Sequence, residues 1–377
     1  MQTKHTNPTS NPPPSANRQA IRRLYAEKYL VWMLLSFAAS VSLTRLFLEL
    51  TGYPQFGSKE LHIAHVLWGG LLLFVAALLP VILANRWVYM VNAILAGVGI
   101  GLFIDEVGKF ITQSNDYFYP AAAPIIYVFF LLTFLLYIFV RRPRRTDPRT
   151  ELYYILEELE EVLDHDLSDE ERNCILARLE AVSKNNSDPV FASLASNLNT
   201  FFRSRRLLIK PVIPGVLTRL LHRLEAFEKR ILTQNRFRGA LVGGLLAFGL
   251  WAASYPVSIL SSLQRNDRLA IVIDRLVSQR IVRGSTSLTL FNARLGLESG
   301  IGLILMIAAV LLALGFDRRA LFISYFGLLV ALTVVNPLLF YFEQFSMIIT
   351  AAVQFLLLLA VVRYRKRFLQ GFYEITI

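Results

Sequence analysis

Long uninterrupted apolar runs are the feature of this sequence that most restricts its fold. A helix needs about 20 apolar residues to cross a hydrocarbon core of about 30 Å at about 1.5 Å per residue. Helices satisfy their own backbone hydrogen bonds, so they are the structure that such runs adopt in lipid. We predict eight transmembrane helices, at about 29–50, 62–85, 87–111, 121–140, 240–261, 299–316, 320–341 and 345–363. The predicted fold is all-α: a polytopic integral membrane protein with two groups of four helices and a helical insert between them.

The composition excludes an ordinary soluble protein, because 55% of the residues are hydrophobic and only 18% are charged. The formal net charge is +12, and the basic residues flank the apolar runs. They therefore indicate the lipid bilayer as the partner and membrane topology as their role, and we expect no nucleic acid. The single cysteine, Cys174, excludes a disulfide framework and a multi-cysteine metal site. We expect it to be buried in the insert.

The positions of lysine and arginine predict the orientation. Basic residues that fall on one side of an eight-span count include Arg22, Arg86, Arg141, Arg318 and Arg365. Positive loops are retained in the cytoplasm, so we expect a cell-membrane protein with both termini cytoplasmic. Segment 262–298 must then lie outside despite its arginines. It is interpreted as an amphipathic helix in the outer interface, or as a helix packed on the spans.

Four regions follow from this organisation. They are a disordered cytoplasmic tail at 1–28, the first four transmembrane helices at 29–140, a cytoplasmic helical domain at 141–239, and the last four transmembrane helices at 240–377. Within the cytoplasmic domain, a helix is predicted at 151–166, and Ser168 with Glu171 forms a capping-box signal for the next helix.

Seven ionisable residues fall at neighbouring ends of the first three spans. They are Arg45, Glu49, His62, His65, Asp105, Glu106 and Lys109. Ionisable groups are costly inside a membrane, which makes each a functional candidate. The predicted orientation puts all seven at the outer face, where Glu343, between the last two spans, can extend the group. We therefore predict an outward-facing polar pocket for a small ion, a solute or a lipid head group, serving binding, transport or sensing.

The spacing of these residues suggests specific pairs. Arg45 and Glu49 are four residues apart, as are Asp105 and Lys109, so each couple can form a salt bridge along its own helix. Glu106 points about 100° away from Asp105 and is expected to lack a partner within its helix. A bundle of structurally paired residues and a proton or ion relay are both consistent with this pattern.

Two histidines allow a metal hypothesis. His62 and His65 share a helix face, and with Glu106 they satisfy the ligand set of zinc or another divalent metal with one open position. An open position can activate water, so a metal-dependent hydrolase at the outer leaflet is one alternative function. Another alternative is a membrane scaffold that works through its cytoplasmic insert. The catalytic residues and the oligomeric state stay unassigned.

Small residues and one proline predict local features of the spans. The glycines within 97–101 form a small-residue stripe that lets another helix come close, and Gly69-Gly70 lies at the matching depth of the second span. That contact would bring His65 toward Glu106. Asn336-Pro337 frees backbone carbonyls within the seventh span, which predicts a kink or, less often, an ion ligand.

The stretch from His62 to Pro120 resembles a recurrent pattern of multi-spanning prokaryotic membrane proteins to which no activity is attached. The residues that carry the resemblance are His62-Ile63-Ala64-His65, Gly97-Val98-Gly99-Ile100-Gly101-Leu102-Phe103-Ile104-Asp105-Glu106 and Asn115-Asp116-Tyr117. The resemblance covers about the first four spans. More loosely, the chain resembles membrane hydrolases that hold zinc among helices, which implies a zinc cofactor. Those proteins typically supply a third histidine, whereas only His62 and His65 lie in the spans of this chain.

Overall fold

The structure is a computed structural model in which every named element is a helix. It describes residues 19–52, 65–113, 119–142, 147–184, 188–204, 207–210, 219, 223, 233–263 and 285–369, without the side chains of 255–263 and 285–288. The chain divides into two compact units. Residues 1–26 with 142–212 form one unit, and residues 27–141 with 213–377 form the other.

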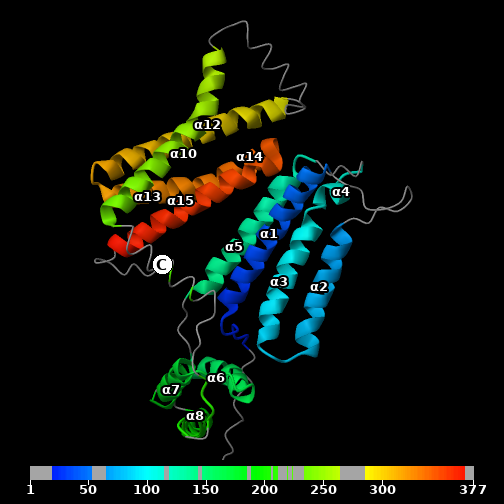
Figure 1. Cartoon of the computed structure of the whole chain (residues 1–377), viewed down its shortest axis with the longest axis vertical. Coiled ribbons are helices and arrows are strands. Elements are labelled where there is room, and N and C mark those ends of the chain that lie inside the picture. The colour runs from blue at the N-terminus through cyan, green and yellow to red at the C-terminus, as the bar shows by residue number, and fades with distance from the viewer. Residues whose placement is uncertain are drawn as a thin grey trace, which may run out of the picture. The chain divides into compact units, whose positions relative to one another are not determined.

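The larger unit contains the apolar helices and confirms the predicted all-α membrane fold (Figure 1). Its first half consists of α1 (Ala26–Thr51), α2 (His65–Ile82), α3 (Trp87–Ile104), the short α4 (Val107–Ile111) and α5 (Ala122–Arg141). Its second half consists of α10 (Gln234–Leu263), α12 (Ser285–Ala313), α13 (Asp317–Val330), the π-helical turn η1 (Ala331–Val335), α14 (Asn336–Glu343), the 3₁₀ turn η2 (Gln344–Ser346) and α15 (Met347–Phe368).

By length and composition, seven helical segments of the described chain can cross a membrane, and the last covers residues 317–368. Its 52 residues would extend about 78 Å if straight, more than twice the hydrocarbon thickness of about 30 Å. The chain reverses direction inside it at Gln344, whose φ is +50°, and α15 returns along α13. The seventh segment therefore contains the last two predicted spans.

The predicted outer segment 262–298 is corrected at its end. Residues 285–298 belong to α12, which begins well before the predicted start at residue 299. The prediction started late because Arg294 and Glu298 interrupt the apolar run. Residues 264–284, which carry the amphipathic pattern, lie outside the described residues.

Close backbone approach joins the first three helices. Gly69 of α2 faces Gly99 of α3, and a Cβ on Gly69 would lie 2.8 Å from the Gly99 carbonyl oxygen. Gly97 and Gly101 face α1 instead, where a Cβ on Gly101 would lie 2.7 Å from the Ser40 Cβ. Glycine is thus required on two faces of α3, because either helix would be displaced by a side chain. The predicted approach of α2 and α3 is confirmed, but the stripe of Gly97 and Gly101 packs on α1.

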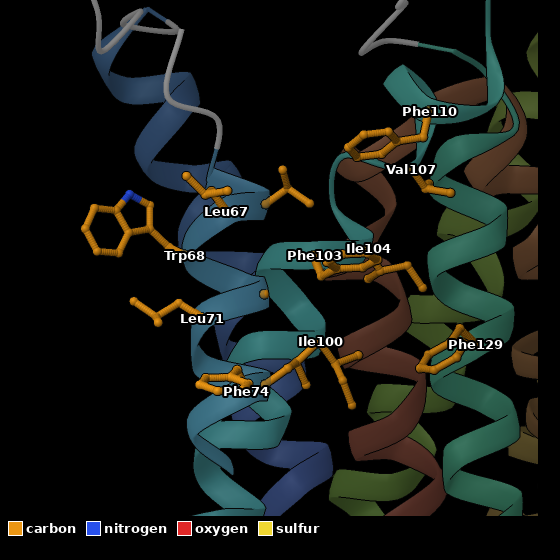
Figure 2. Close-up of a pocket in the computed structure, with 13 residues that line it drawn as sticks. Leu67, Trp68, Leu71, Phe74, Ile100, Phe103, Ile104, Val107, Phe110 and Phe129 are labelled. Carbon is orange, nitrogen blue, oxygen red and sulfur yellow. The ribbon is translucent and has the colours of Figure 1, made fainter. Parts of the chain in front are cut away.

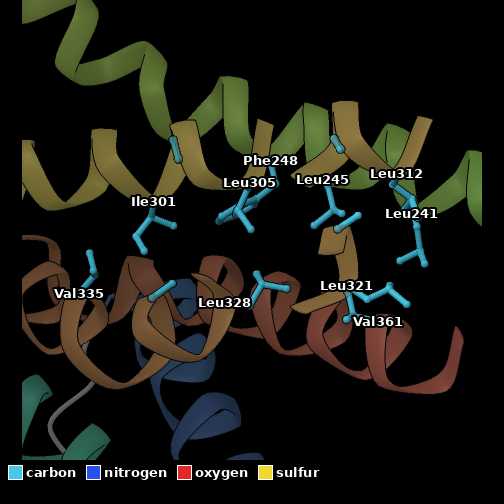
Figure 3. Packing of buried hydrophobic residues seen from close by; sticks show 14 of the residues in the cluster. Leu241, Leu245, Phe248, Ile301, Leu305, Leu312, Leu321, Leu328, Val335 and Val361 are labelled. Carbon is cyan, nitrogen blue, oxygen red and sulfur yellow. The ribbon is translucent and has the colours of Figure 1, made fainter. Parts of the chain in front are cut away.

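The second half is held by a continuous apolar core (Figure 3). Leu245 of α10 and Leu305 of α12 face Leu328 of α13 across this core, and all three are fully buried. Gly249 and Gly302 allow α10 and α12 to approach as closely as α2 and α3 do. Since the outward side chains of these helices are also apolar, lipid is the solvent that the outer surface fits.

The smaller unit contains α6 (Pro148–Leu163), α7 (Asp169–Lys184) and α8 (Pro189–Phe202). The capping box is confirmed: the Glu171 N–H donates to Ser168 Oγ at 3.3 Å, and the Ser168 N–H donates to a Glu171 carboxylate oxygen at 3.0 Å. The expectation of a buried Cys174 is wrong, since it is exposed on α7. The chain before α1 also packs on this unit, where the Leu24 N–H donates to Glu157 at 3.2 Å.

Candidate functional site

The site is built where α3 ends. The Asp105 N–H still donates to the Gly101 carbonyl, but Glu106 leaves the helix with φ −92° and ψ 10° before α4 begins at Val107. This break turns two successive carboxylates inward. Asp105 is 0% exposed and Glu106 is 1% exposed, although residues this close in sequence would diverge by about 100° on a continuous helix.

Arg45 of α1 forms a buried ion pair with Asp105. Its Nε lies 2.5 Å from Asp105 Oδ1, and its Nη2 donates to the Asp105 carbonyl oxygen at 3.0 Å. The guanidinium carbon lies 3.7 Å from the centre of the Phe345 ring, which covers it from η2. This pair therefore fixes the end of α3 to α1, and the cation–π contact links both to the second half of the bundle.

His65, the first residue of α2, lies between the two carboxylates. Its Nε2 is 3.0 Å from Asp105 Oδ2 and its Nδ1 is 3.1 Å from Glu106 Oε1. A neutral imidazole has one N–H donor and one acceptor nitrogen, and a carboxylate only accepts. Both contacts become hydrogen bonds when one further proton resides on the imidazole or on a carboxyl group. The imidazole therefore links α2 to both carboxylates at the end of α3.

Lys109 completes what we call the α3-end cluster: Arg45, His65, Asp105, Glu106 and Lys109. Its Nζ lies 3.3 Å from Glu106 Oε1. The side chains of His65 and Lys109 are 23% and 25% exposed, whereas those of Asp105 and Glu106 are almost fully buried. The partly exposed side chains of the cluster are thus the imidazole, whose nitrogens both face carboxylates, and the Lys109 ammonium group.

The structure corrects the pairs expected from spacing. Arg45 pairs with Asp105 of another helix, while Glu49 is exposed and forms no ion pair with any described residue. Glu106 does have a local partner, Lys109, because the helix break changes the register that the spacing argument assumed. The predicted approach of His65 to Glu106 is present. His62 lies outside the described residues.

Glu343 belongs to a different group. It pairs with Arg294 of α12, and Arg294 Nε also lies 3.5 Å from Glu298 Oε2 one turn along the same helix. We call Arg294, Glu298 and Glu343 the α12 cluster. Sequence reasoning missed its first two members because it placed them in an outer segment. Two ionisable residues four apart at the start of an apolar run were the available signal.

An apolar pocket of about 1130 Å³ is lined by residues of α2, α3, α4 and α5 (Figure 2). In Figure 2, Leu71 and Phe74 lie on α2, Ile104 on α3 and Phe129 on α5. The full lining consists of Val66, Leu67, Trp68, Gly70, Leu71, Leu73, Phe74, Ile100, Phe103, Ile104, Val107, Phe110 and Phe129. No sequence pattern distinguished these residues from other lipid-facing side chains, since hollowness depends on how the helices diverge.

The metal hypothesis stays a prediction. Among the described residues, no group of three histidine, cysteine, aspartate or glutamate side chains is placed to hold a metal ion. In that part of the chain both ring nitrogens of His65 face carboxylates, and His62, the other predicted ligand, is not described.

Comparison of the chain with protein-family models, curated proteins and solved structures gave no match. The function is therefore argued from the site alone.

Proposed function

We propose that the α3-end cluster and the apolar pocket together bind an anionic lipid, with the head group at Lys109 and an acyl chain in the pocket. The observation that carries this proposal is their continuity along the chain. Three pocket residues, Val66, Ile104 and Val107, are the immediate neighbours of His65, Asp105 and Glu106. A polar group that adjoins the lining residues of an apolar cavity along the chain suits an amphiphile.

The polar end favours an anionic group. Lys109 is partly exposed, and its ammonium group has three N–H donors, one of which is directed at Glu106 Oε1. Phosphate and carboxylate groups accept hydrogen bonds and gain from a nearby positive charge. Arg45 is buried against Asp105 and Phe345, so it supports the site without meeting the ligand directly.

The apolar end favours a hydrocarbon chain. All its lining residues are apolar, and Trp68, Phe103 and Phe110 are exposed at its edge. Burying a methylene group contributes about 0.8 kcal/mol, so a chain lying along these rings gains several kcal/mol. Transport and sensing, the other functions predicted for this site, would both begin with the binding of an anionic lipid.

Fluorescence quenching of Trp68 tests the proposal. In full-length protein carrying Trp32→Phe, Trp87→Phe and Trp251→Phe, we expect brominated phosphatidylglycerol to quench Trp68 more strongly than brominated phosphatidylcholine in mixed nanodiscs. One basic residue near a membrane contributes about 1 kcal/mol, so Lys109→Met should reduce the preference about fivefold. Lys109→Arg should keep it. Gly70→Leu should reduce quenching by both lipids, since a Cβ there meets nothing within 4 Å and the side chain would fill the pocket.

The matched control retains Trp251 alone, which is exposed on α10 away from the pocket lining. It should respond equally to both lipids. Equal quenching of Trp68 by the two lipids would overturn the proposal. Loss of the lipid preference on adding millimolar inorganic phosphate would instead indicate a site for a free anion, and would also contradict a lipid ligand.

A further inference from the structure

The α12 cluster contains a buried carboxylate. Glu298 lies one turn along α12 from Arg294, which pairs with Glu343 beside the chain reversal at Gln344. Glu298 is 7% exposed. A carboxylate buried to this extent requires compensation, because little water can solvate it.

The compensation within the described cluster is incomplete. One guanidinium, that of Arg294, serves both Glu298 and Glu343, so the three described charges leave one negative charge. The Glu343 side chain is 40% exposed, whereas Glu298 Oε2 is buried and accepts no hydrogen bond from the described residues. The uncompensated charge is therefore most costly at Glu298, and protonation is the ordinary way to remove it.

A small cavity lies beside the Glu298 carboxyl group. Its volume is about 10 Å³, and its polar lining comes from Glu298, Thr350 and Gln354, with Phe248 and Trp251 among the apolar residues. This volume is about that of one water molecule. Hard metal cations take about six oxygen ligands, which three polar side chains do not supply. The cavity thus suits a water molecule that passes a proton.

Neighbouring elements bring no other charged side chain to this carboxyl group among the described residues. α14 contributes Glu343, and α15 contributes Gln354, whose Oε1 accepts from Asn336 Nδ2 at 2.7 Å. Asn336 Nδ2 also lies 3.2 Å from the Tyr127 hydroxyl of α5. These neutral groups orient the polar lining but cannot neutralise a carboxylate.

We propose that Glu298 is a buried proton-binding site. A hydronium ion gives its proton to one Glu298 oxygen and becomes water, which converts the carboxylate to a neutral carboxyl group, while Arg294 remains with Glu343. No electron transfer accompanies this step. The inference uses other residues than the lipid site, so either can fail without the other.

Infrared difference spectroscopy tests this site. Full-length protein in nanodiscs is stepped from high to low pH, and we expect, beside the band of the exposed carboxyl groups, a separate protonated-carboxyl stretching band at higher frequency that shifts in D₂O. Glu298→Gln should abolish that band, whereas Glu49→Gln, which alters an exposed carboxylate, should leave it in place. A band of unchanged intensity in Glu298→Gln would overturn the proposal.

Two further measurements keep the test decisive. If Glu298→Gln fails to fold, Glu298→Asp provides the same information, because the proposal requires the band to shift in frequency. Exchange of potassium for sodium at constant ionic strength should leave the wild-type band unchanged. Loss of the band in sodium alone would identify a metal-cation site and overturn the assignment of a proton.

Discussion

Buried charges in this protein are paired across helices rather than along them. Arg45 has Glu49 one turn away, yet its guanidinium binds Asp105 at 2.5 Å. The choice follows from burial, since Asp105 is enclosed by α1, α2 and α3 while Glu49 faces outward. An exposed pair is worth little, whereas leaving a buried carboxylate without its partner costs several kcal/mol.

A double-mutant cycle measures this difference. We expect Arg45→Gln to lower the free energy of unfolding by about 3–5 kcal/mol, because Asp105 is left buried and short of a cation. The coupling energy between Arg45→Gln and Asp105→Asn should be about 1–3 kcal/mol. Glu49→Gln should change stability by less than about 0.5 kcal/mol and show no coupling with Arg45→Gln. Unfolding in mixed micelles provides the readout, and a larger coupling with Glu49 would contradict the structure.

Residue type and depth were enough to predict the members of the α3-end cluster, but of their contacts only the approach of His65 to Glu106 was predicted. Arg45, His65, Asp105, Glu106 and Lys109 follow from the cost of charge in lipid together with the count of spans. The partners of these side chains depend on the helix break after Asp105. No local sequence pattern in 97–106 predicts that break. The apolar pocket could not be predicted from the sequence either, because lipid-facing residues and pocket-lining residues are both apolar.

At the scale of elements, the kink predicted at Asn336-Pro337 is a π-helical turn. One of its carbonyl groups receives its hydrogen bond from another helix. The Asn336 N–H donates to the Ala331 carbonyl, five residues back. The next bond in this register would join residue 337 to the Leu332 carbonyl, but proline has no N–H. The Tyr127 hydroxyl of α5 donates to that carbonyl at 2.8 Å. A side chain from the first half therefore supplies the donor that the second half lacks.

This arrangement predicts a rescue. Tyr127→Phe should destabilise the protein by about 1–3 kcal/mol, because the buried Leu332 carbonyl loses its donor. In a Pro337→Ala background the same change should cost less, since the alanine N–H can reach that carbonyl. Tyr137→Phe is the control on the same helix, as its hydroxyl has no hydrogen bond to the described residues. Equal costs of Tyr127→Phe in both backgrounds would exclude the proposed exchange of donors.

Element positions were largely predictable, because the length of an apolar run and the thickness of lipid leave few choices. The exceptions have specific causes. α12 starts earlier than predicted because Arg294, which interrupts the apolar run, is paired inside the fold with Glu343 and faces Glu298. Gly97 and Gly101 contact α1 rather than α2 because α3 carries glycines on two faces, and a stripe alone does not identify its partner.

At the scale of the whole molecule, the predicted sidedness is open to a direct measurement. Cys174 is the single cysteine and is exposed, so it reports the side on which the smaller unit lies. In sealed right-side-out vesicles, a membrane-impermeant maleimide should label Cys174 only after permeabilisation. In a Cys174→Ala background, a cysteine introduced by Gln113→Cys, beyond α4, should be labelled without permeabilisation. Labelling of both positions from one side would refute the orientation derived from the basic residues.

The Tyr127 hydrogen bond to Leu332 also has a mechanical meaning for the larger unit. It joins α5 to the turn between α13 and α14, part-way along each. The Arg45 guanidinium over the Phe345 ring joins the same two helix groups at a second level. Two such contacts at different levels oppose rotation of one helix group against the other, so a load on either group is carried by both.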